Sequence, residues 1–265
     1  MMDFHAAQTQ ASVFERPILW APPKRTGDSA TLDGKCRQLR ERLLEIARTH
    51  QHARLASSLS AEDMVITDVI LREAGKSEQY RDIARHIDIF TLETGRLPIA
   101  TLALLDQIQA RYGTQLAIYR PDQAAVQAYI DQYGMNGFYE SLQARRQCCD
   151  IRKVVPLAAA LADADAWITG QRREQSVTRS DLALHEHDEA RGISKYNPLF
   201  DWSEQEIWAY VEQYSVPVNA LHYQGYPSIG CDPCTKAIRV GEDPRAGRWW
   251  WENQDSRECG LHVHN

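Results

Sequence analysis

The segment ARLASSLSAED at residues 53–63 decides the fold, because it joins a strand to a helix through one polar turn. Its first five residues predict a short strand, and the run from Glu62 to Ala74 predicts a helix. Backbone N–H groups at a helix N-terminus favour a bound phosphate or sulfate, and the serines of the turn add donors. Serine is also a common helix cap, so the turn taken alone fits an ordinary cap at least as well.

The same alternation of strand and helix recurs along the chain. The stretch HIDIFTL at 86–92 predicts a buried strand, and further strands are expected at 115–119 and 166–170. Helices are expected at 33–50, 98–112, 122–133, 152–162 and 203–214. Ser203 followed by Glu206 predicts a capping box at the start of the last helix. This pattern predicts an α/β fold with a mostly parallel sheet and helices on both faces.

The chain of 265 residues divides into three predicted parts. Residues 1–32 predict a flexible N-terminal extension, with an arm packed on a neighbouring element as the alternative. Residues 33–214 carry the strand–helix alternation and form the expected α/β domain. Residues 215–265 are rich in Pro, Gly, Cys and Trp, and predict an irregular C-terminal segment that ends in a mobile tail.

Charge and composition exclude several classes of protein. The chain has 30 Lys and Arg against 36 Asp and Glu, a net charge of −6, so we expect no nucleic-acid partner. No apolar run reaches the roughly 18 residues of a membrane helix, and the N-terminus has no apolar signal core. We therefore expect a cytoplasmic protein without a membrane partner. In that reducing compartment, clustered cysteines indicate metal or redox chemistry rather than disulfides.

Four of the six cysteines form two close pairs, Cys148–Cys149 and Cys231–Cys234. Four thiolates are what an all-cysteine iron–sulfur cluster or an all-cysteine zinc site needs. Adjacent cysteines are hard to place on one tetrahedral zinc ion, whereas two iron atoms of one cluster can accept both, so we favour [4Fe–4S]. The alternative is four unrelated core cysteines. Four basic residues surround the first pair and imply a nearby anion site: Arg145, Arg146, Arg152 and Lys153.

Other residues also suit chemistry on an anion. Cys259 lies close to His262 on the C-terminal tail, a setting that suits a thiolate nucleophile, although an incidental terminal cysteine fits about equally. The loop at 170–179 places three arginines after a strand, as anion binding would require, although a solvated charged loop fits nearly as well. The loop LETGR at 92–96 places a further arginine after a strand. Cys36, inside the first predicted helix, fits a small buried hydrophobe.

Taken together, these segments resemble the assimilatory adenylyl-sulfate (APS) reductases of the iron–sulfur branch. The resemblance covers about residues 40–265 and rests on SSLSAED, LETGRLP, CCDIRKVVPL, ITGQRREQSVTR, YNPLFDW, GCDPCT, GEDPRAGRWWWE and ECGLH. It implies an adenine-nucleotide α-hydrolase fold, which is Rossmann-like, with SSLSAED as the phosphate loop. That loop lacks the SGGxDS form of ATP-cleaving members, which fits a substrate without a pyrophosphate to break.

The resemblance also implies roles for matching residues. Cys259 would be the nucleophile, with His262 close to it. The ligands of the [4Fe–4S] cluster would be Cys148, Cys149, Cys231 and Cys234. The residues at or beside the phosphosulfate of the substrate would be Lys153, Ser58, Ser60, Arg179, Arg245 and Arg248.

Three positions depart from the usual pattern of these reductases. Arg145 stands where some members have histidine, Val155 replaces a common glutamate, and Glu93 replaces the usual aspartate. These departures leave the implied chemistry in place but affect the surroundings of the site.

The implied reaction converts APS to sulfite and AMP in assimilatory sulfate reduction, on the way to cysteine. Cys259 would attack the sulfur of APS and carry a thiosulfonate, from which thioredoxin or a glutaredoxin-type dithiol would release sulfite. The cluster, beside Lys153, would act electrostatically. Members of the family are often homo-oligomers, so a homo-oligomer is possible here.

Other functions stay open at this point. A reductase of 3′-phosphorylated APS (PAPS), or one that takes both substrates, is the first alternative, although PAPS-specific relatives usually lack the four cluster cysteines. A tRNA-thiolating PP-loop enzyme is more distant, since SGGxDS is missing and the chain is acidic. A non-enzymatic iron–sulfur carrier or a structural zinc protein is the third.

Overall fold

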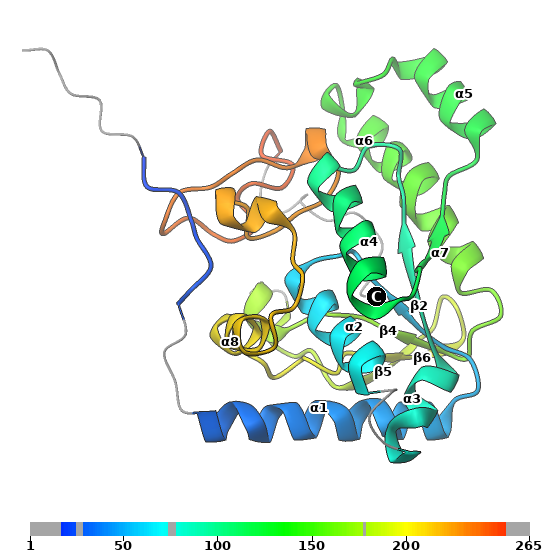
Figure 1. The fold of residues 1–265 in the computed structure, drawn as a ribbon. Coiled ribbons are helices and arrows are strands. Elements are labelled where there is room, and N and C mark those ends of the chain that lie inside the picture. Colours follow the sequence, from blue (N-terminus) through cyan, green and yellow to red (C-terminus); the bar gives the residue numbers. More distant parts are fainter. Residues whose placement is uncertain (1–16, 25–28, 74–77, 177–178, 253–265) are drawn as a thin grey trace, which may run out of the picture.

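The computed structural model describes residues 17–24, 29–73, 78–176 and 179–252, and a six-stranded sheet forms its centre (Figure 1). The strands are β1 (Ala53–Ala56), β2 (Ile87–Leu92), β3 (Ala117–Tyr119), β4 (Ala166–Ile168), β5 (His185–Asp188) and β6 (Ile193–Tyr196). They lie in the order β3-β2-β1-β4-β6-β5. All neighbouring strands are parallel except β5 and β6. The predicted α/β class with a mostly parallel sheet is therefore confirmed.

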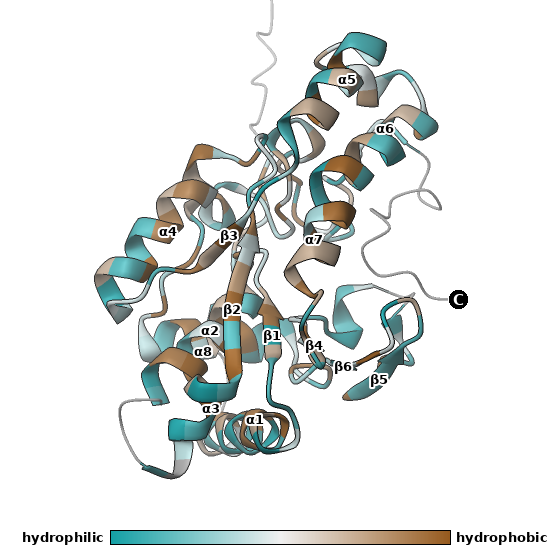
Figure 2. Ribbon diagram, turned by 90° about the vertical axis from the view of Figure 1, so that its right-hand side faces the viewer, coloured by the Kyte–Doolittle hydropathy of each residue, from teal (hydrophilic) through white to brown (hydrophobic). Residues whose placement is uncertain are grey.

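Helices cover both faces of this sheet (Figures 1 and 2). They are α1 (Ser29–Thr49), α2 (Ala61–Glu73), α3 (Arg81–His86), α4 (Ile99–Tyr112), α5 (Gln123–Tyr133), α6 (Leu142–Cys149), α7 (Val155–Ala160) and α8 (Glu204–Tyr214). A π-helical stretch, η3 (Asp150–Val154), joins α6 to α7.

Alternate residues of the strands build two separate cores. Leu55, Ile89 and Ile168 belong to the larger core, which also takes the buried faces of α1, α2, α4 and α8. Phe90 and Trp167 point to the other face and pack with residues of α7. This division follows from the period of two residues in a strand.

The register of the strands brings three strand ends to one edge of the sheet. Leu55 of β1 pairs with Ile89 of β2 on one side and with Ile168 of β4 on the other. The loops that follow these strands therefore start side by side at the carboxyl edge, where ligands of open parallel sheets bind.

The predicted capping box is confirmed at the start of α8. The Ser203 hydroxyl accepts from the Glu206 N–H at 3.1 Å, and the Glu206 carboxylate accepts from the Ser203 N–H at 2.8 Å. Cys36 is also buried as predicted, at 2% exposure.

The hairpin of β5 and β6 and the helix α6 were not among the predicted elements. β5 has the sequence HEHD, and its side chains alternate between exposed and half-buried positions. Such a polar edge strand lacks the apolar signal that marks the central strands.

The first helix begins upstream of its predicted start at residue 33. Helix α1 begins at Ser29, and Leu32 is buried. Further upstream, the Trp20 N–H donates to the Ile238 carbonyl at 3.0 Å, and the Trp20 ring lies 6.3 Å from that of Trp208. Residues 17–24 thus pack on the C-terminal segment and α8.

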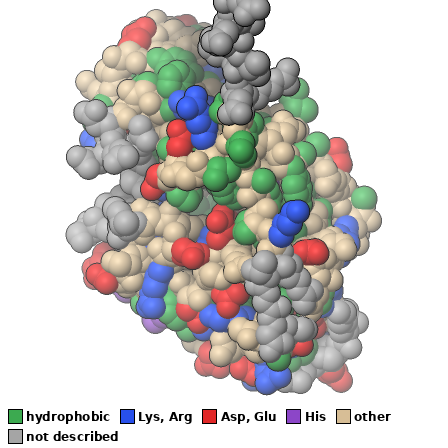
Figure 3. Space-filling model, turned by 90° about the vertical axis from the view of Figure 1, so that its left-hand side faces the viewer, with side chains coloured by type: hydrophobic (Ala, Val, Ile, Leu, Met, Phe, Trp, Pro, Cys, Tyr) green, Lys and Arg blue, Asp and Glu red, His purple; other side chains and the backbone are tan. Residues whose placement is uncertain are grey.

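The surface shows no single area of basic charge on the face in Figure 3, where the described acidic and basic side chains are interspersed. Within the described ranges, none of the helices combines the length and the apolar character that crossing a membrane demands.

Candidate active site and cysteine centre

A cavity of about 410 Å³ lies at the carboxyl edge of the sheet. Ala56 at the end of β1, Leu92 at the end of β2 and Thr169 just after β4 all line it. The C-terminal segment contributes the remaining wall through residues 227–230, 244–245 and 248–249. The sequence placed chemistry in the three strand-ending loops, and the cavity is formed where these loops meet.

The serine loop between β1 and α2 is organised by a buried carboxylate. Asp63 accepts hydrogen bonds from the Ser58 N–H at 2.7 Å, from the Ser58 hydroxyl at 2.6 Å and from the Ser60 hydroxyl at 3.3 Å. Burial raises the pKa of Asp63 to about 6, although the hydrogen bonds from Ser58 lower it. Both predicted serines line the cavity. Asp63 was not predicted, and its only sequence signal is its position in the first turn of the helix.

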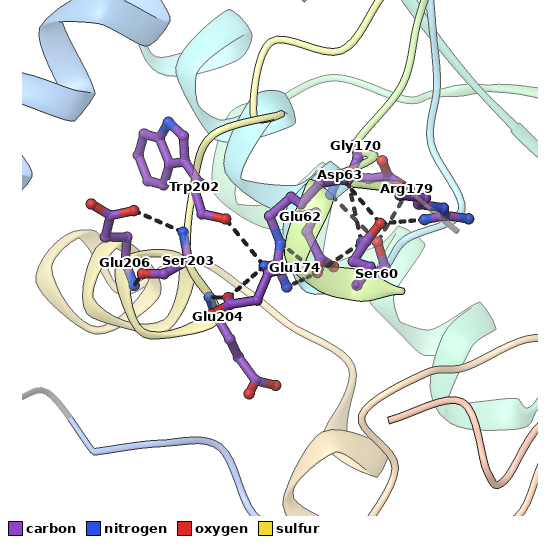
Figure 4. A network of polar contacts seen from close by, with 12 residues as sticks. Ser60, Glu62, Asp63, Gly170, Glu174, Arg179, Trp202, Ser203, Glu204 and Glu206 are labelled. Carbon is purple, nitrogen blue, oxygen red and sulfur yellow. Dashed lines mark hydrogen bonds and ion pairs between the residues drawn. The ribbon is translucent and has the colours of Figure 1, made fainter. Parts of the chain in front are cut away.

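The loop after β4 is bound to the serine loop through Arg172. Figure 4 shows Glu62 and Asp63 beside Gly170 and Glu174 of that loop. The Arg172 guanidinium donates to Glu62 at 2.8 Å and 3.1 Å, and to Glu174 at 3.1 Å. Although burial raises the pKa of Glu62, the charge of Arg172 and the hydrogen bonds from Arg172 and Gln175 together outweigh burial and hold that pKa below its ordinary value. Arg172 therefore holds two loops together.

The three arginines predicted to bind an anion separate into different environments. Arg172 contacts the carboxylates just described, and the Arg173 Nε donates to the Leu182 carbonyl at 2.8 Å. Arg179 lines the cavity and donates to Gln175. All three arginines thus donate to protein groups, and Arg172 and Arg179 also line the cavity.

A cluster of cations lines another part of the same cavity: Lys153, Arg245 and Arg248. Arg248 is packed over Gly230, where an added Cβ would lie only 2.3 Å from the guanidinium Nη2. Its Nη1 donates to the Ile229 carbonyl at 3.3 Å and to the Ser228 hydroxyl at 3.4 Å. The absence of a side chain at Gly230 therefore allows Arg248 to occupy this wall.

The four paired cysteines line a second, smaller cavity: Cys148, Cys149, Cys231 and Cys234. Three of them are at least 92% buried, and no described cysteine forms a disulfide. Burial, and after it the neighbouring Cys231 and Cys149, raise the pKa of Cys234 to about 12, although the charges of Lys153 and Arg248 lower it. Among the described residues, no three His, Cys, Asp or Glu side chains are placed to hold one metal ion. The thiols instead line the walls of a common space.

Basic side chains surround this cysteine cavity. Arg96, Arg145, Arg152 and Lys153 line it. Lys153 also lines the larger cavity, so its side chain lies between the two. The Thr94 hydroxyl lies 3.3 Å from the Cys231 sulfur, and the Arg152 Nη1 donates to the Thr94 carbonyl at 2.6 Å. The loop after β2 thus links the strand ends to the cysteines.

The three departures from the family pattern have different surroundings. Arg145 is fully buried and donates to Glu252 at 2.7 Å and 3.0 Å, with its guanidinium 4.9 Å from the Trp249 ring centre. Val155 is exposed. The Glu93 carboxylate accepts from the Gly95 N–H at 2.6 Å. Only Arg145 bears directly on the cysteine centre, because it lines that cavity.

Two predicted site residues, Cys259 and His262, lie outside the described residues. The described chain ends at Glu252, whose carboxylate is held by Arg145 beside the cysteine cavity.

The fold and the cavities define an α/β protein with a partly cation-lined cavity at the carboxyl edge of its sheet, beside a second cavity lined by four cysteines. The family model for the phosphoadenosine phosphosulfate reductase domain matches residues 52–237. The chain therefore belongs to this family.

Curated relatives match over most of the chain, and each is named adenosine 5′-phosphosulfate reductase. The Burkholderia cepacia protein is 53% identical over 232 residues, covering 88% of this chain and 89% of its own length. The Neisseria meningitidis serogroup A protein is 52% identical over 249 residues, covering 93% and 98%. The Allochromatium vinosum protein is 52% identical over 222 residues, covering 84% and 83%.

Solved structures share the fold at lower identity. A phosphoadenylyl-sulfate reductase from Candida auris superposes with a TM-score of 0.62 at 23% identity, covering 81% of this chain and 100% of that one. An FMN adenylyltransferase from Candida glabrata superposes with a TM-score of 0.55 at 13% identity, covering 91% and 79%. These likenesses support the fold alone.

Proposed function

We propose that this protein is a thiol-dependent reductase that converts APS to sulfite and AMP in assimilatory sulfate reduction. The carrying observation is the position of Lys153, which lines both the larger cavity and the cysteine cavity. A cation between a nucleotide-sized cavity and a thiol centre suits chemistry on a multiply charged anion. The curated relatives that match over most of the chain are named for the same activity.

The phosphosulfate of APS would bind to the cationic wall, where Arg245 and Arg248 lie near Lys153. The serine loop, with Ser58 and Ser60, and Arg179 would complete the anion site, in agreement with their position on the same cavity. The adenine would occupy the apolar part of the cavity, which Phe90, Leu92, Leu97 and Leu157 line. An anion held this way is neutralised and oriented before a thiolate approaches it.

The cysteine cavity fits an all-cysteine [4Fe–4S] cluster. Four thiols from two pairs line one space, and none of them forms a disulfide. Four basic side chains line the same space and would balance the negative charge of the thiolates and the cluster. The ligands would be Cys148, Cys149, Cys231 and Cys234. When bound, the cluster would supply a fixed charge beside Lys153 and so act electrostatically.

The chemical step would be carried by Cys259, assigned from the sequence. Its thiolate attacks the sulfur of APS, the bond between that sulfur and the bridging phosphate oxygen breaks, and AMP leaves with the electron pair. A dithiol of the thioredoxin or glutaredoxin type then attacks the Cys259 sulfur and releases sulfite. The second thiol of the donor frees Cys259 and leaves the donor as a disulfide, which accounts for the two electrons. His262 would stand close to the nucleophile.

We also propose the cytoplasm as the compartment of this protein, because no described cysteine forms a disulfide and the proposed cluster ligands need a reducing environment. A homo-oligomer is compatible with these assignments.

The direct test is mass spectrometry of the anaerobically purified protein after incubation with APS. We expect an adduct of ~80 Da on Cys259, which the dithiol removes with release of sulfite. The adduct should be lost in Cys259→Ser and kept in the matched control Cys36→Ala, whose side chain is buried in the larger hydrophobic core. An adduct that persists in Cys259→Ser, or none on the wild-type protein, would refute the mechanism. Iron and sulfide counts of about four each test the cluster, and PAPS tested in parallel decides the substrate.

A further inference from the structure

Gln171 is a buried polar side chain whose hydrogen-bonding groups have no protein partner. It is 4% exposed and lines the larger cavity immediately after Gly170. Its backbone N–H donates to the Thr169 hydroxyl at 3.3 Å. Among the described residues, neither the Oε1 nor the Nε2 atom of its amide has a partner. Because an unsatisfied buried amide is costly, this side chain indicates a ligand group that completes it.

The loop of Gln171 lies against several carboxylates, two of which are paired with Arg172. An added Cβ on Gly170 would lie 2.3 Å from the Asp63 carboxylate and 3.1 Å from the Glu62 Cβ, so this backbone is pressed against the serine loop. Glu174 and Glu204 line the same cavity. Arg172 donates to Glu62 and Glu174 here. A second phosphate group is therefore poorly matched to this wall.

The chemistry of the amide narrows the group that it can bind. A phosphate or sulfate ester offers acceptors only, so it would satisfy the Nε2 donor and leave the Oε1 acceptor unpaired. A ribose hydroxyl both donates and accepts and can satisfy either atom. The adenine ring, which is flat and largely apolar, matches the wall of Phe90 and Leu92 better than the polar end of β4.

We propose that Gln171 hydrogen-bonds the ribose hydroxyls of the adenosine nucleotide and so selects a free ribose over a 3′-phosphorylated one. This inference rests on the proposed function, because it takes an adenosine nucleotide as the ligand. Gln171 is then a specificity-determining residue: it contacts the sugar, while the cations at Lys153 and Arg248 contact the sulfonated end.

The experiment measures the affinity of the whole protein, purified anaerobically, for AMP, 2′-deoxy-AMP, 3′-deoxy-AMP, IMP and adenosine 3′,5′-bisphosphate by calorimetry. The variants are Gln171→Leu and the matched control Gln38→Leu, since Gln38 is exposed on α1. For the wild type and the control, we expect AMP to bind about tenfold more tightly than at least one deoxy analogue. In Gln171→Leu, AMP should bind about tenfold more weakly and that preference should vanish.

Two further readouts separate binding from structure. The wild type should bind AMP more tightly than adenosine 3′,5′-bisphosphate, and the ratio of the two affinities should be smaller in Gln171→Leu. The melting temperature of the ligand-free Gln171→Leu variant should equal or exceed that of the wild type, because leucine removes a buried amide without a partner. A purely structural role would instead lower it.

The outcomes are distinguishable. If Gln171→Leu still binds AMP more tightly than the deoxy analogues, Gln171 does not contact the ribose. IMP differs from AMP in the base alone, so a variant that loses only the preference for AMP over IMP also overturns the role of Gln171 at the ribose. An unchanged preference against the bisphosphate overturns its role in selection. A wild-type protein that binds AMP but gives no Cys259 adduct with APS contradicts the proposed function and leaves the ribose contact supported.

Discussion

The two walls of the larger cavity are built in different ways. One wall consists of the serine loop and the loop after β4. These loops begin directly after β1 and β4, and the pairing of the two strands fixes where the loops start. The cationic wall with Arg248 belongs to the C-terminal segment, which has only short 3-10 helices, η6 (Ala220–Gln224) and η7 (Asp232–Cys234), among its described residues. It is held by an isolated bridge between Thr235 and Arg248, by backbone hydrogen bonds such as that from the Lys236 N–H to the Gly247 carbonyl at 3.0 Å, and by side chains. The Trp249 ring, for example, lies 4.6 Å from the Arg248 guanidinium.

This difference suggests separate tasks for the two walls. A wall on the strands of the sheet can hold the nucleoside in one place, whereas a segment outside the sheet and without long helices can carry groups that approach and leave. The comparison predicts that substitutions on the C-terminal side affect turnover most, while substitutions on the strand side affect stability and nucleotide affinity.

The largest effect is expected at Gly230. In Gly230→Ala, the new methyl group would collide with the Arg248 guanidinium, because the Cβ would lie 2.3 Å from its Nη2. Displacing a cation from the sulfonated end should lower kcat/KM for APS about 100- to 1,000-fold. Steady-state kinetics checks this, with Gly34→Ala as the matched control, since a Cβ at Gly34 would meet no atom within 4 Å. Equal kcat/KM values for the two variants would contradict the role given to the close packing of Arg248 against Gly230.

A smaller effect is expected from the titration of Asp63 on the strand side. Its folded pKa of about 6 lies above its ordinary value of 3.8, so its contribution to stability is present at low pH and is lost as the pH rises through about 6. Between pH 4 and pH 7, the wild type should lose roughly 2–3 kcal/mol of unfolding free energy relative to Asp63→Asn. Urea unfolding of both proteins across this range measures the difference. A constant difference would show that Asp63 does not titrate there.

The smallest effect is expected at Trp20, which joins the N-terminal arm to the C-terminal segment. Its ring packs 6.3 Å from that of Trp208 and 6.4 Å from that of His222. Trp20→Ala should cost about 1–2 kcal/mol of stability through lost apolar contact. The nucleotide affinity should stay close to that of the wild type, because Trp20 is not among the residues that line the cavity. Thermal melts and calorimetry test the two halves of this prediction, and a large loss of AMP affinity would contradict the second.

Local patterns in the sequence predicted the elements that carry a strong apolar or capping signal. The central strands were found because apolar residues fill them, and the capping box of α8 was found because Ser203 and Glu206 are three residues apart. The hairpin of β5 and β6 was missed because its edge strand is polar. Asp63 and Gln171 were missed as functional residues because their type and spacing are ordinary. They stand out only because the folded chain buries their polar side chains.

The sequence by itself determined the alternation of strands and helices, the two cysteine pairs and the serine loop, because periodicity and covalent spacing are local properties of the chain. Only the tertiary structure decided which side chains meet. Arg172 reaches Glu62 across 110 positions, and Arg145 reaches Glu252 across 107. Lys153 lines two cavities, and Gln171 lines one of them, while its buried amide has no protein partner among the described residues. Such contacts depend on the packing of distant segments, which the local pattern of residues does not encode.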